Sequence, residues 1–347
     1  MGTGSYIGWD IGGAHLKMAH IDKDGRVITA CQIPTPLWLG LDKLDTSIVQ
    51  AKKSFSGLPV SHSITTTAEL SDIFSDRHNG LAKLVQIVSD ALHDNTIRFY
   101  GGDAGWITID RTDQYVREIA SANWHATACF VAGKIDEGIL VDIGSTTTDI
   151  IPFRHGRLLT QGYTDYERLS CGELVYTGII RTPVMAMVSE LPVNGINIPV
   201  IPEHFATMSD VYRLLGKLQE QDDMMSTADG AGKSTFESAR RLARMLAIDI
   251  HESESLDKWI VLAEHIANVQ QEKITSALNR ILFDIKSKKP VLVGAGAGRF
   301  LVKQIATANN YSYLDFEDLL DASDEMKSCA ARSAAAVAVA QLSRSGS

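Results

Sequence analysis

The stretch VDIGSTTTDI, residues 141–150, decides the fold that the rest of the chain must complete. An apolar strand runs to Asp142, Gly144 follows, and a run of hydroxyl residues leads to a second acid at Asp149. A glycine directly after a buried strand lets the backbone turn sharply and lets amide N–H groups approach an anion without interference from a Cβ atom. The stretch therefore predicts a strand, a tight phosphate-binding turn and a return strand.

The same layout occurs a second time near the start of the chain. WDIGGAHLKMAHIDKDGRVITACQ (9–32) and VDIGSTTTDIIPFRHGRLLTQGY (141–163) both place Asp-Ile-Gly before a strand and a turn that ends in Gly-Arg. The spacing between the motif and this turn differs by one residue between the copies. An internal repeat of this kind predicts two similar lobes that face each other.

The two copies differ in their chemistry. The second copy offers hydroxyl donors at Ser145, Thr146, Thr147 and Thr148, and Asp142 can hold Mg²⁺ or its waters. The first copy, from Asp10 and Gly12, has Gly13, Ala14, His15, Leu16 and Lys17 in place of that run, with Lys17 aligned to Asp149. The turn of the first copy would then contribute cations, and the turn of the second copy would contribute carboxylates. Two plain β-hairpins, whose Asp and Thr residues only satisfy turns, are the alternative interpretation.

A third glycine cluster lies in PVLVGAGAGRFLVKQIA (290–306), where an apolar strand passes through Gly294, Gly296 and Gly298 into a helical pattern. Its spacing lacks the later glycine of a Rossmann dinucleotide motif and it lies late in the chain, so we do not expect NAD binding. Because it follows two phosphate-type turns, it predicts a third contact with the same ligand.

The bulk composition excludes several classes of protein. The 347 residues are 45% hydrophobic and 22% charged, with a net charge of -9, so we expect no nucleic-acid partner. The four scattered cysteines indicate a reducing compartment rather than a disulfide framework. With no apolar run long enough to span a membrane and no signal-peptide pattern, we expect a cytoplasmic protein. The sequence leaves a homodimer open.

Together, the three loops resemble those of the actin-like ATPase superfamily of sugar kinases, Hsp70 chaperones and actin. Asp10 to Gly13 resembles its first phosphate loop, Asp142 to Thr147 its second, and Gly294 to Gly298 its adenosine loop. The resemblance implies an α/β fold with two actin-like, ribonuclease H-like lobes around a central cleft, where a diphosphate and Mg²⁺ would bind. We place the lobes at residues 1–135 and 136–347, with a small insertion near 190–235.

Several segments between the loops also carry candidate residues. A helix is expected from about Glu69, which would place Glu69 and Asp72 on one helical face, either as functional acids or as complements to the helix dipole. ASANWHATACF (120–130) places Asn123 and Trp124 in a helix of small residues, where Trp124 is also compatible with a plain core position. GELVYTGIIRTPVMAMV (172–188) contains Glu173 and Arg181, for which a buried ion pair is the structural alternative.

Residues 227–250 carry a false nucleotide signal. The Gly-Lys-Ser at 232–234 lacks the earlier glycine of a P-loop, because Thr227 occupies that position. A helix with a basic stripe of Arg240, Arg241 and Arg244 should follow, as a solvated face or else as a guard for acidic substrate groups. Residues 256–283 predict a long amphipathic helix, and the Ala-rich tail predicts a helix packed closely on one lobe.

IGWDIGGAHLK, TTTAELSDIF, ASANWHATA, GSTTTDIIPF and TDYERLSCGELVYTGIIRTPV together resemble the hydantoinase/oxoprolinase-related proteins of tetrahydromethanopterin-linked one-carbon metabolism, over nearly the full length. The resemblance implies a transferase of methanofuran-type cofactor synthesis. Such an enzyme joins an aminomethylfuran-methyl diphosphate to the phenol of a (glutamyl-)tyramine or tyrosine derivative and releases pyrophosphate. Its partners would be these small diphosphate and phenol or amine substrates.

The resemblance also implies roles for particular residues. Asp10 and Asp142 would hold Mg²⁺, Lys17 or Arg181 would be cationic partners, and Glu69, Asp72 or Glu173 would take the phenol proton. Thr67, Asp72, Asn123 and Trp124 would bind the substrate, and Asn123 and Trp124 would line its aromatic pocket. The diphosphate would bind to the loops, at Gly12, Gly13, His15, Gly144, Ser145, Thr146, Thr147, Gly294, Gly296 and Gly298.

Two other functions fit the same loops. An ATP-dependent small-molecule kinase or oxoprolinase-like hydrolase would bind ATP or ADP and turn ATP over with an acceptor. A nucleotide-switched regulator or reactivating chaperone would use nucleotide to control a partner protein. His15 stands where many members of the superfamily have Ser or Thr, which weakens a standard grip on ATP.

Overall fold

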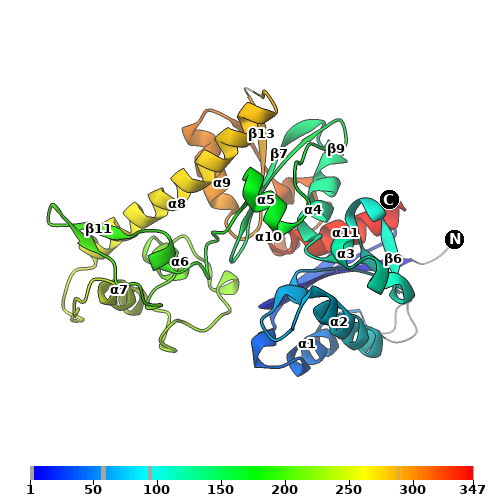
Figure 1. Ribbon diagram of the computed structural model, residues 1–347, viewed down its shortest axis with the longest axis horizontal. Helices are drawn as coiled ribbons and strands as arrows, with labels where there is room; N and C mark the ends of the chain where they lie inside the picture. Colours follow the sequence, from blue (N-terminus) through cyan, green and yellow to red (C-terminus); the bar gives the residue numbers. More distant parts are fainter. Residues whose placement is uncertain (1–3, 56–59, 93–95, 288, 347) are drawn as a thin grey trace. The chain divides into compact units, whose positions relative to one another are not determined.

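The computed structural model describes residues 4–55, 60–92, 96–287 and 289–346. The chain divides into two compact units (Figure 1). Unit 1 comprises Met1–Leu140, Ile151–Arg168 and Leu314–Ser347, and unit 2 comprises Val141–Ile150 and Leu169–Tyr313. This division differs from the expected one at residue 135, because the C-terminal segment returns to unit 1.

Unit 1 contains a mixed sheet with the strand order β3-β2-β1-β4-β5-β6. β1 pairs antiparallel with β2 and parallel with β4, so the strand that carries Asp10 lies in the middle of the sheet. The elements in chain order are β1 (Ser5–Ile11), β2 (His15–Ile21), β3 (Val27–Pro34), the 3₁₀ helix η1 (Leu37–Leu39), α1 (Asp42–Lys52), β4 (Val60–Thr66), η2 (Ala68–Leu70), α2 (Arg77–Leu92), β5 (Thr96–Tyr100), η3 (Gly102–Ala104), β6 (Trp106–Thr108), η4 (Ile109–Gln114), α3 (Val116–Ile119) and α4 (Asn123–Ala132).

The two faces of this sheet are covered differently. Because side chains alternate along a strand, Ile7, Trp9 and Ile11 point to one face. There they join the core formed with α1 and α2, which lie side by side in Figure 1. The intervening Gly8 faces α11 (Ala334–Ser345), where a Cβ atom on Gly8 would overlap the carbonyl oxygen of Ala336. The Ala-rich tail therefore packs on β1 at backbone distance.

The second sheet has the order β10-β8-β7-β13-β14, with β9 beside β8. The division between the units falls within β7 (Glu137–Ile143), β8 (Thr148–Arg154) and β14 (Ser312–Asp315). The remaining elements are β9 (Arg157–Leu158), α5 (Asp165–Cys171), β10 (Leu174–Val175), η5 (Val184–Ala186), β11 (Glu190–Val193), β12 (Ile196–Pro199), α6 (Met208–Leu214), η6 (Glu220–Asp222), α7 (Thr235–Arg244), α8 (Asp257–Asp284), β13 (Val291–Ala295), α9 (Arg299–Ala308), η7 (Phe316–Leu319) and α10 (Asp324–Arg332).

Most of the predicted elements are confirmed. The α/β class appears as two six-stranded sheets with flanking helices in the described part of the chain. The long amphipathic helix is α8. Within the expected insertion, β11 and β12 form a hairpin whose Asn194-Gly195 turn has positive φ at both residues, as a type I′ turn requires. None of the described helices combines the length and the apolarity needed to cross a membrane.

We expect Gly8→Ala to lower the free energy of unfolding by about 1–3 kcal/mol, because the new methyl group would push α11 away from β1. Urea denaturation would measure the change. Gly133→Ala is the matched control in unit 1: its Cβ atom would meet its nearest neighbours at 3.5 Å, so it should be neutral or stabilise by up to about 1 kcal/mol. Equal effects of the two substitutions would contradict the close packing of α11.

Candidate functional site

The tight turn predicted after each Asp-Ile-Gly motif is present in both units, with the same closing hydrogen bond. In turn 1, residues 12–15, the amide of the first residue donates to the carbonyl of the fourth over 3.0 Å. In turn 2, residues 144–147, the equivalent distance is 2.9 Å. The predicted duplication is thus confirmed in the backbone. Since the closing bond does not use the amides of the two central residues, the turn orients these amides without consuming them.

Turn 2 rests on a second backbone segment of unit 2. A Cβ atom on Gly178 would overlap the backbone at Ser145, so only glycine allows this approach. The amides of Ile180 and Arg181 donate to the carbonyl of Ser145 over 3.2 and 2.9 Å. The chain after β10 therefore fixes the position of turn 2.

Gln270 of α8 anchors this supporting segment to the core. Its amide nitrogen donates to Thr177 Oγ1 over 2.7 Å and to the carbonyl of Gly178 over 2.9 Å, and its oxygen accepts from the Tyr212 hydroxyl at 2.5 Å. The Gln270 side chain is fully buried. It is a positioning residue for turn 2 that our sequence reasoning missed.

The third glycine cluster also packs beside turn 2. The amide of Gly298 donates to the carbonyl of the last residue of β7 over 2.9 Å. Gly296 has a φ of +77°, and a Cβ atom there would overlap the Asp142 carboxylate, while the ring of Tyr313 fills the corresponding space at Gly294. Contacts within the protein thus explain why all three positions are glycine. The role of these residues as an adenosine-type loop stays a prediction.

The side chains of turn 2 leave it accessible to a ligand. Asp142, Thr146 and Thr147 are partly exposed. The Ser145 hydroxyl is buried and has no hydrogen-bond partner among the described residues. Thr148 differs from its neighbours, since it is buried and donates to the carbonyl of Thr177 over 2.7 Å. Of the four predicted hydroxyl donors, Thr148 is therefore structural.

In unit 1, Asp10 lies buried at the end of β1, directly across the sheet from Lys17. The Lys17 Nζ atom is 3.5 Å from Asp10 Oδ2. The other oxygen, Oδ1, is buried without a hydrogen-bond partner among the described residues. Burial raises the pKa of Asp10, and the Lys17 charge opposes that rise. The buried, unused carboxylate oxygen fits a Mg²⁺ ligand, because Mg²⁺ is commonly held by one or two carboxylates plus water and phosphate oxygens.

Turn 1 lies against the end of β4. Thr67 donates its amide to the carbonyl of Ile11 over 3.0 Å, and its Oγ1 atom would lie 3.8 Å from a Cβ atom on Gly12. His15, the last residue of turn 1, is buried. Unit 1 thus brings Asp10, Lys17, turn 1 and Thr67 together.

The prediction of a helix that begins near Glu69 is wrong. Only the three-residue η2 forms there, and α2 begins at Arg77. Glu69 is 1% exposed, whereas Asp72 is exposed in the turn that follows η2. The two acids therefore do not share a helical face.

Hydrogen bonds from Ser121 and Thr66 hold the Glu69 carboxyl group in place. Its Oε1 atom accepts from the Ser121 amide over 3.0 Å, and its Oε2 atom lies 3.1 Å from Thr66 Oγ1. Thr66 Oγ1 also accepts from the Ala68 amide over 3.0 Å and lies 3.1 Å from the carbonyl oxygen of Ile11. Burial raises the pKa of Glu69 to about 7, although the hydrogen bonds from Thr66 and Ser121 oppose that rise.

Ser121 is a second residue that sequence reasoning missed. It is buried with a φ of +55°, and its hydroxyl lies 3.2 Å from Glu69 Oε1. The partly exposed Asn123 begins α4 two residues later. Trp124 is 2% exposed and its ring stacks with the Arg168 guanidinium at 4.1 Å, so it belongs to the core of unit 1. Its role in substrate binding stays a prediction.

The remaining predicted residues lie in unit 2. Glu173 is buried, and its carbonyl accepts from the Ile150 amide over 2.8 Å. Arg181 is exposed, although its amide binds turn 2. The Glu173–Arg181 ion pair stays the structural alternative for this segment.

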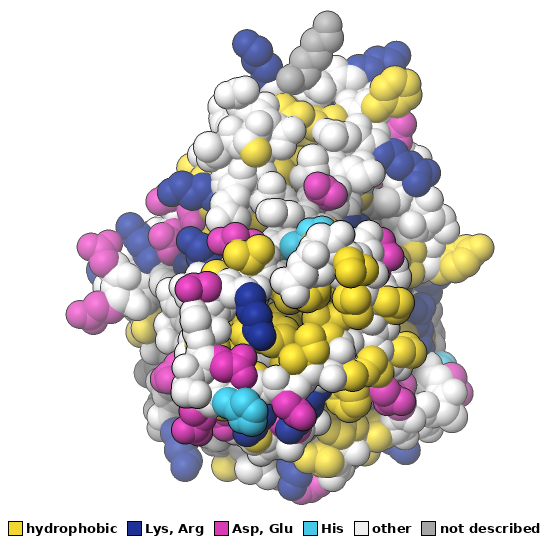
Figure 2. Space-filling view, turned by 90° about the vertical axis from the view of Figure 1, so that its left-hand side faces the viewer, with side chains coloured by type: hydrophobic (Ala, Val, Ile, Leu, Met, Phe, Trp, Pro, Cys, Tyr) yellow, Lys and Arg dark blue, Asp and Glu magenta, His cyan; other side chains and the backbone are white. Residues whose placement is uncertain are grey.

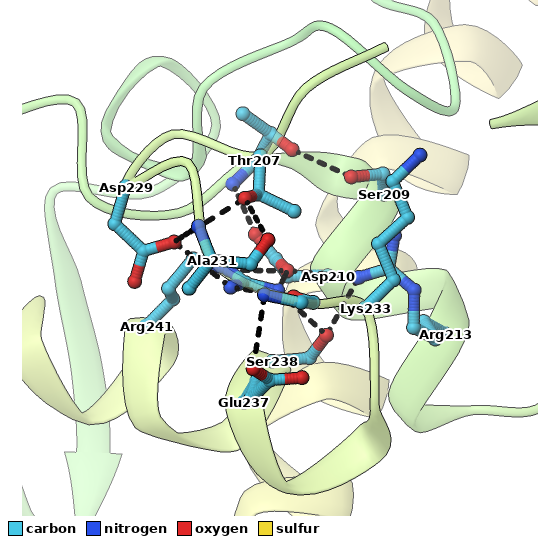
Figure 3. Close-up of polar contacts among 12 residues, drawn as sticks. Thr207, Ser209, Asp210, Arg213, Asp229, Ala231, Lys233, Glu237, Ser238 and Arg241 are labelled. Atoms are coloured by element: carbon cyan, nitrogen blue, oxygen red, sulfur yellow. Dashed lines mark hydrogen bonds and ion pairs between the residues drawn. The ribbon is translucent and has the colours of Figure 1, made fainter. Parts of the chain in front are cut away.

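The prediction that the basic stripe of α7 is solvated is wrong for Arg241, the middle residue of the three. Arg241 is fully buried and binds Asp210 and Asp229 at 2.8 and 3.0 Å (Figure 3). The misleading Gly-Lys-Ser instead starts the helix: Ser234 accepts from the amide of Glu237, whose carboxylate returns to the Ser234 amide. This capping box satisfies the amides at the helix N-terminus.

Two further properties of the described residues are the grouping of metal-binding side chains and the distribution of surface charge. Among the described residues, no group of three or more His, Cys, Asp or Glu side chains is placed to hold a metal ion. On the face drawn in Figure 2, acidic and basic side chains are interspersed rather than gathered into a basic stripe.

Comparison with known proteins gives consistent matches. The family model described as hydantoinase/oxoprolinase matches residues 61–345. A Methanocaldococcus jannaschii protein is 32% identical over 291 residues, which cover 84% of this chain and 86% of that relative. A Methanococcus vannielii protein is 29% identical over 192 residues, covering 54% of this chain and 86% of the relative. Both are named (4-{4-[2-(gamma-L-glutamylamino)ethyl]phenoxymethyl}furan-2-yl)methanamine synthase.

Among solved structures, nucleotide-free acetone carboxylase matches with a TM-score of 0.54 at 11% sequence identity. The match covers 88% of this chain and 67% of that chain. At this identity the likeness shows a shared fold only.

The raised pKa of Glu69 predicts a pH dependence of stability. The unfolded chain loses this proton near pH 4.3, whereas the folded protein keeps it up to about pH 7, so rising pH between these values favours unfolding. Glu69→Gln, which mimics the protonated acid, should remove this term. In urea denaturation we expect the wild type to lose at least about 1.4 kcal/mol relative to the variant between pH 4.5 and pH 8. A constant difference across this range would show that Glu69 is ionised throughout.

We expect Arg241→Met to lower the free energy of unfolding by about 3 kcal/mol, because it removes a fully buried guanidinium that binds Asp210 and Asp229 and leaves Arg213 as the remaining cation at Asp210. Arg244→Ala is the matched control on the same helix. Its side chain is 44% exposed and pairs with Asp229 at 2.8 Å, so its loss should cost at most about 1 kcal/mol. Thermal or urea unfolding of both variants would rank them, and the reverse order would contradict the network in Figure 3.

Proposed function

Since the chain belongs to the hydantoinase/oxoprolinase family, we propose that it is an enzyme that forms an aryl ether. In the proposed reaction, an aminomethylfuran-methyl diphosphate is joined to the phenol oxygen of a (glutamyl-)tyramine or tyrosine derivative, and pyrophosphate is released. The product would serve synthesis of a methanofuran-type cofactor in one-carbon metabolism.

The observation that carries this proposal is the 32% identity to a relative over 84% of the chain. That relative is named as the synthase of a phenoxymethyl furan, a compound in which an ether oxygen joins a phenol ring to a furan CH₂ group. The duplicated turns add independent support, because backbone turns of this kind suit the diphosphate that such a substrate would carry.

The reaction balances without an oxidant, a reductant or ATP. The phenol loses its O–H proton, a new O–CH₂ bond forms, and the bond between CH₂ and the diphosphate oxygen breaks. The leaving pyrophosphate takes the electron pair, while the furan oxygen helps disperse positive charge on the CH₂ carbon. Groups that bind the departing negative charge more tightly in the transition state than in the ground state would accelerate this step.

Turn 2 is the part of unit 2 assigned to the diphosphate. Its central amides and the hydroxyls of Ser145, Thr146 and Thr147 would donate to phosphate oxygens, and Arg181 would add positive charge from the adjacent segment. Gly178 and Gln270 keep this turn in place, so the donors need not reorganise as charge develops.

Turn 1 supplies the corresponding groups of unit 1. The amides at Gly13 and Ala14 would bind phosphate oxygens, with Lys17 as the adjacent cation. Asp10 through its unused Oδ1 atom, together with Asp142, would hold Mg²⁺ directly or through water. When bound, Mg²⁺ would neutralise charge on the leaving diphosphate.

A base must take the phenol proton, because a neutral phenol with a pKa near 10 is a weak nucleophile. Of the three candidates, Glu69 has a pKa raised to about 7, which suits proton transfer near neutral pH. Its burial and its bonds to Thr66 and Ser121 mean that it would act only after local rearrangement. Asp72 is already exposed, and Glu173 is buried in unit 2.

A product assay tests the proposal directly. Purified protein would be incubated with Mg²⁺ and either ATP alone or a furfuryl-type diphosphate plus tyramine or γ-glutamyltyramine. Pyrophosphate together with a coupled ether, identified by mass spectrometry, is the expected result. Formation of ADP with a phosphorylated or hydrolysed acceptor would instead establish the ATP-dependent alternative, and nucleotide binding without any product would favour a switched regulator.

Asp142→Asn should reduce the rate at least about 100-fold with little change in melting temperature, because it removes the charge and keeps the size of a partly exposed side chain. Asp249→Asn, at an exposed carboxylate of the same unit, is the control and should leave the rate unchanged. Turnover of Asp142→Asn within a few-fold of the wild type would remove Asp142 from the proposed metal site.

The double variant of Asp10→Asn and Asp142→Asn tests whether both carboxylates act on one ligand. Residues that serve one bound group show non-additive losses, so the double variant should lose less than the product of the two single losses. Fully independent effects would mean that the two acids do not share a ligand.

A further inference from the structure

An exposed tryptophan lies beside turn 1. Trp38 is 44% exposed, whereas Trp9, Trp124 and Trp259 are buried and Trp106 is partly buried. A tryptophan side chain carries a large apolar surface, so exposing one in a fixed position sacrifices much of the stabilisation that burial would bring. The position of Trp38 therefore calls for an explanation.

The backbone attaches Trp38 firmly to turn 1. The amide of Thr35 donates to the carbonyl of Ala14 over 2.8 Å, and the amide of Leu37 donates to the carbonyl of Gly13 over 3.1 Å. The Leu37 side chain is fully buried. Trp38 directly follows this anchor in η1, so its backbone position is set by turn 1 itself.

A second 3₁₀ helix next to turn 1 also carries an exposed apolar side chain. A Cβ atom on Gly13 would lie 3.0 Å from Ser71 Oγ, which places the end of η2 next to turn 1. Leu70, in η2, is 43% exposed, and Leu39, in η1, is 66% exposed. Two 3₁₀ helices therefore lie next to turn 1: η1 exposes Trp38 and Leu39, and η2 exposes Leu70. Gly13 adds no side chain there.

We propose that Trp38, with Leu39 and Leu70, forms the wall that binds the furan ring of the diphosphate substrate. This inference rests on the proposed function, in which turn 1 binds the diphosphate. Only one CH₂ group separates that diphosphate from the furan ring, so the ring must lie immediately beside the turn. An aromatic ring stacked on an indole face gains both apolar burial and favourable ring geometry.

The wall would determine specificity rather than perform chemistry. It would hold the ring carbon that bears the reacting CH₂ group, and it would select aromatic diphosphates over pyrophosphate or an aliphatic diphosphate. Trp38 would thus affect binding of the ring while leaving binding of the phosphates to the turns.

Kinetics with matched variants test the inference. Trp38→Ala should raise KM for a furfuryl-type diphosphate about tenfold and leave the inhibition constant of pyrophosphate within twofold of the wild type. Trp38→Phe should retain most of the affinity, because it keeps an aromatic face. Ile28→Ala, at a 47% exposed apolar side chain of β3, is the control and should change neither constant.

Fluorescence gives a readout that is independent of turnover. The acrylamide-accessible emission that the wild type has and Trp38→Phe lacks reports on Trp38. Furfuryl diphosphate with Mg²⁺ should shield this emission, whereas pyrophosphate with Mg²⁺ or tyramine alone should not.

The outcomes separate this inference from the proposed function. A wild type that couples the substrates, with an unchanged KM in Trp38→Ala and no shielding, overturns the furan wall alone. Shielding by tyramine instead of the furfuryl diphosphate assigns the wall to the phenol ring and also overturns it. A wild type that neither binds nor converts the furfuryl diphosphate overturns both.

Discussion

The rest of the structure depends on one constraint: neighbouring backbone segments pack against each other so closely that only glycine fits at the points of contact. Turn 2 keeps its shape because residues 178, 296 and 298 carry no Cβ atom and can lie against the end of β7 and the turn itself. β1 meets α11 in the same way through Gly8. Packing of this density leaves almost no freedom to adjust, so a single methyl group at Gly8, Gly178 or Gly296 must displace backbone atoms, and one at Gly298 must displace the Ile143 side chain. The donors proposed to bind phosphate are thus held by contacts that involve no functional side chain.

The local geometry of the site could be predicted from the sequence because it depends on neighbouring residues. A glycine after a strand, repeated at matched spacing, defines a turn in a few residues, and both turns form as expected. The sequence pattern could have revealed Gln270, since it lies one helical turn from both Ile266 and Ile274 in the buried stripe of α8. A polar side chain in such a stripe needs buried partners, and we did not follow that signal.

The features that could not be predicted depend on distant partners. Arg241 looks like one member of a solvated stripe until Asp210, 31 residues earlier in the sequence, is placed against it. Glu69 looks like the start of a helix, but its carboxyl group is used by Ser121, 52 residues later, and the chain forms one 3₁₀ turn instead. In both cases a tertiary contact overrides the local pattern, and no spacing rule reveals that contact in advance.

The return of α11 to β1 has a consequence for how the protein is made. Synthesis proceeds from the N-terminus, and domains generally fold as their segments emerge. The residues of unit 2 from 169 to 313 are continuous in the chain, whereas unit 1 is assembled from three separate segments. The face of β1 at Gly8 stays uncovered until residues 334–345 have been translated. A strand made early is therefore covered late, and a nascent chain stalled before α11 would expose this face of the sheet to chaperones and proteases.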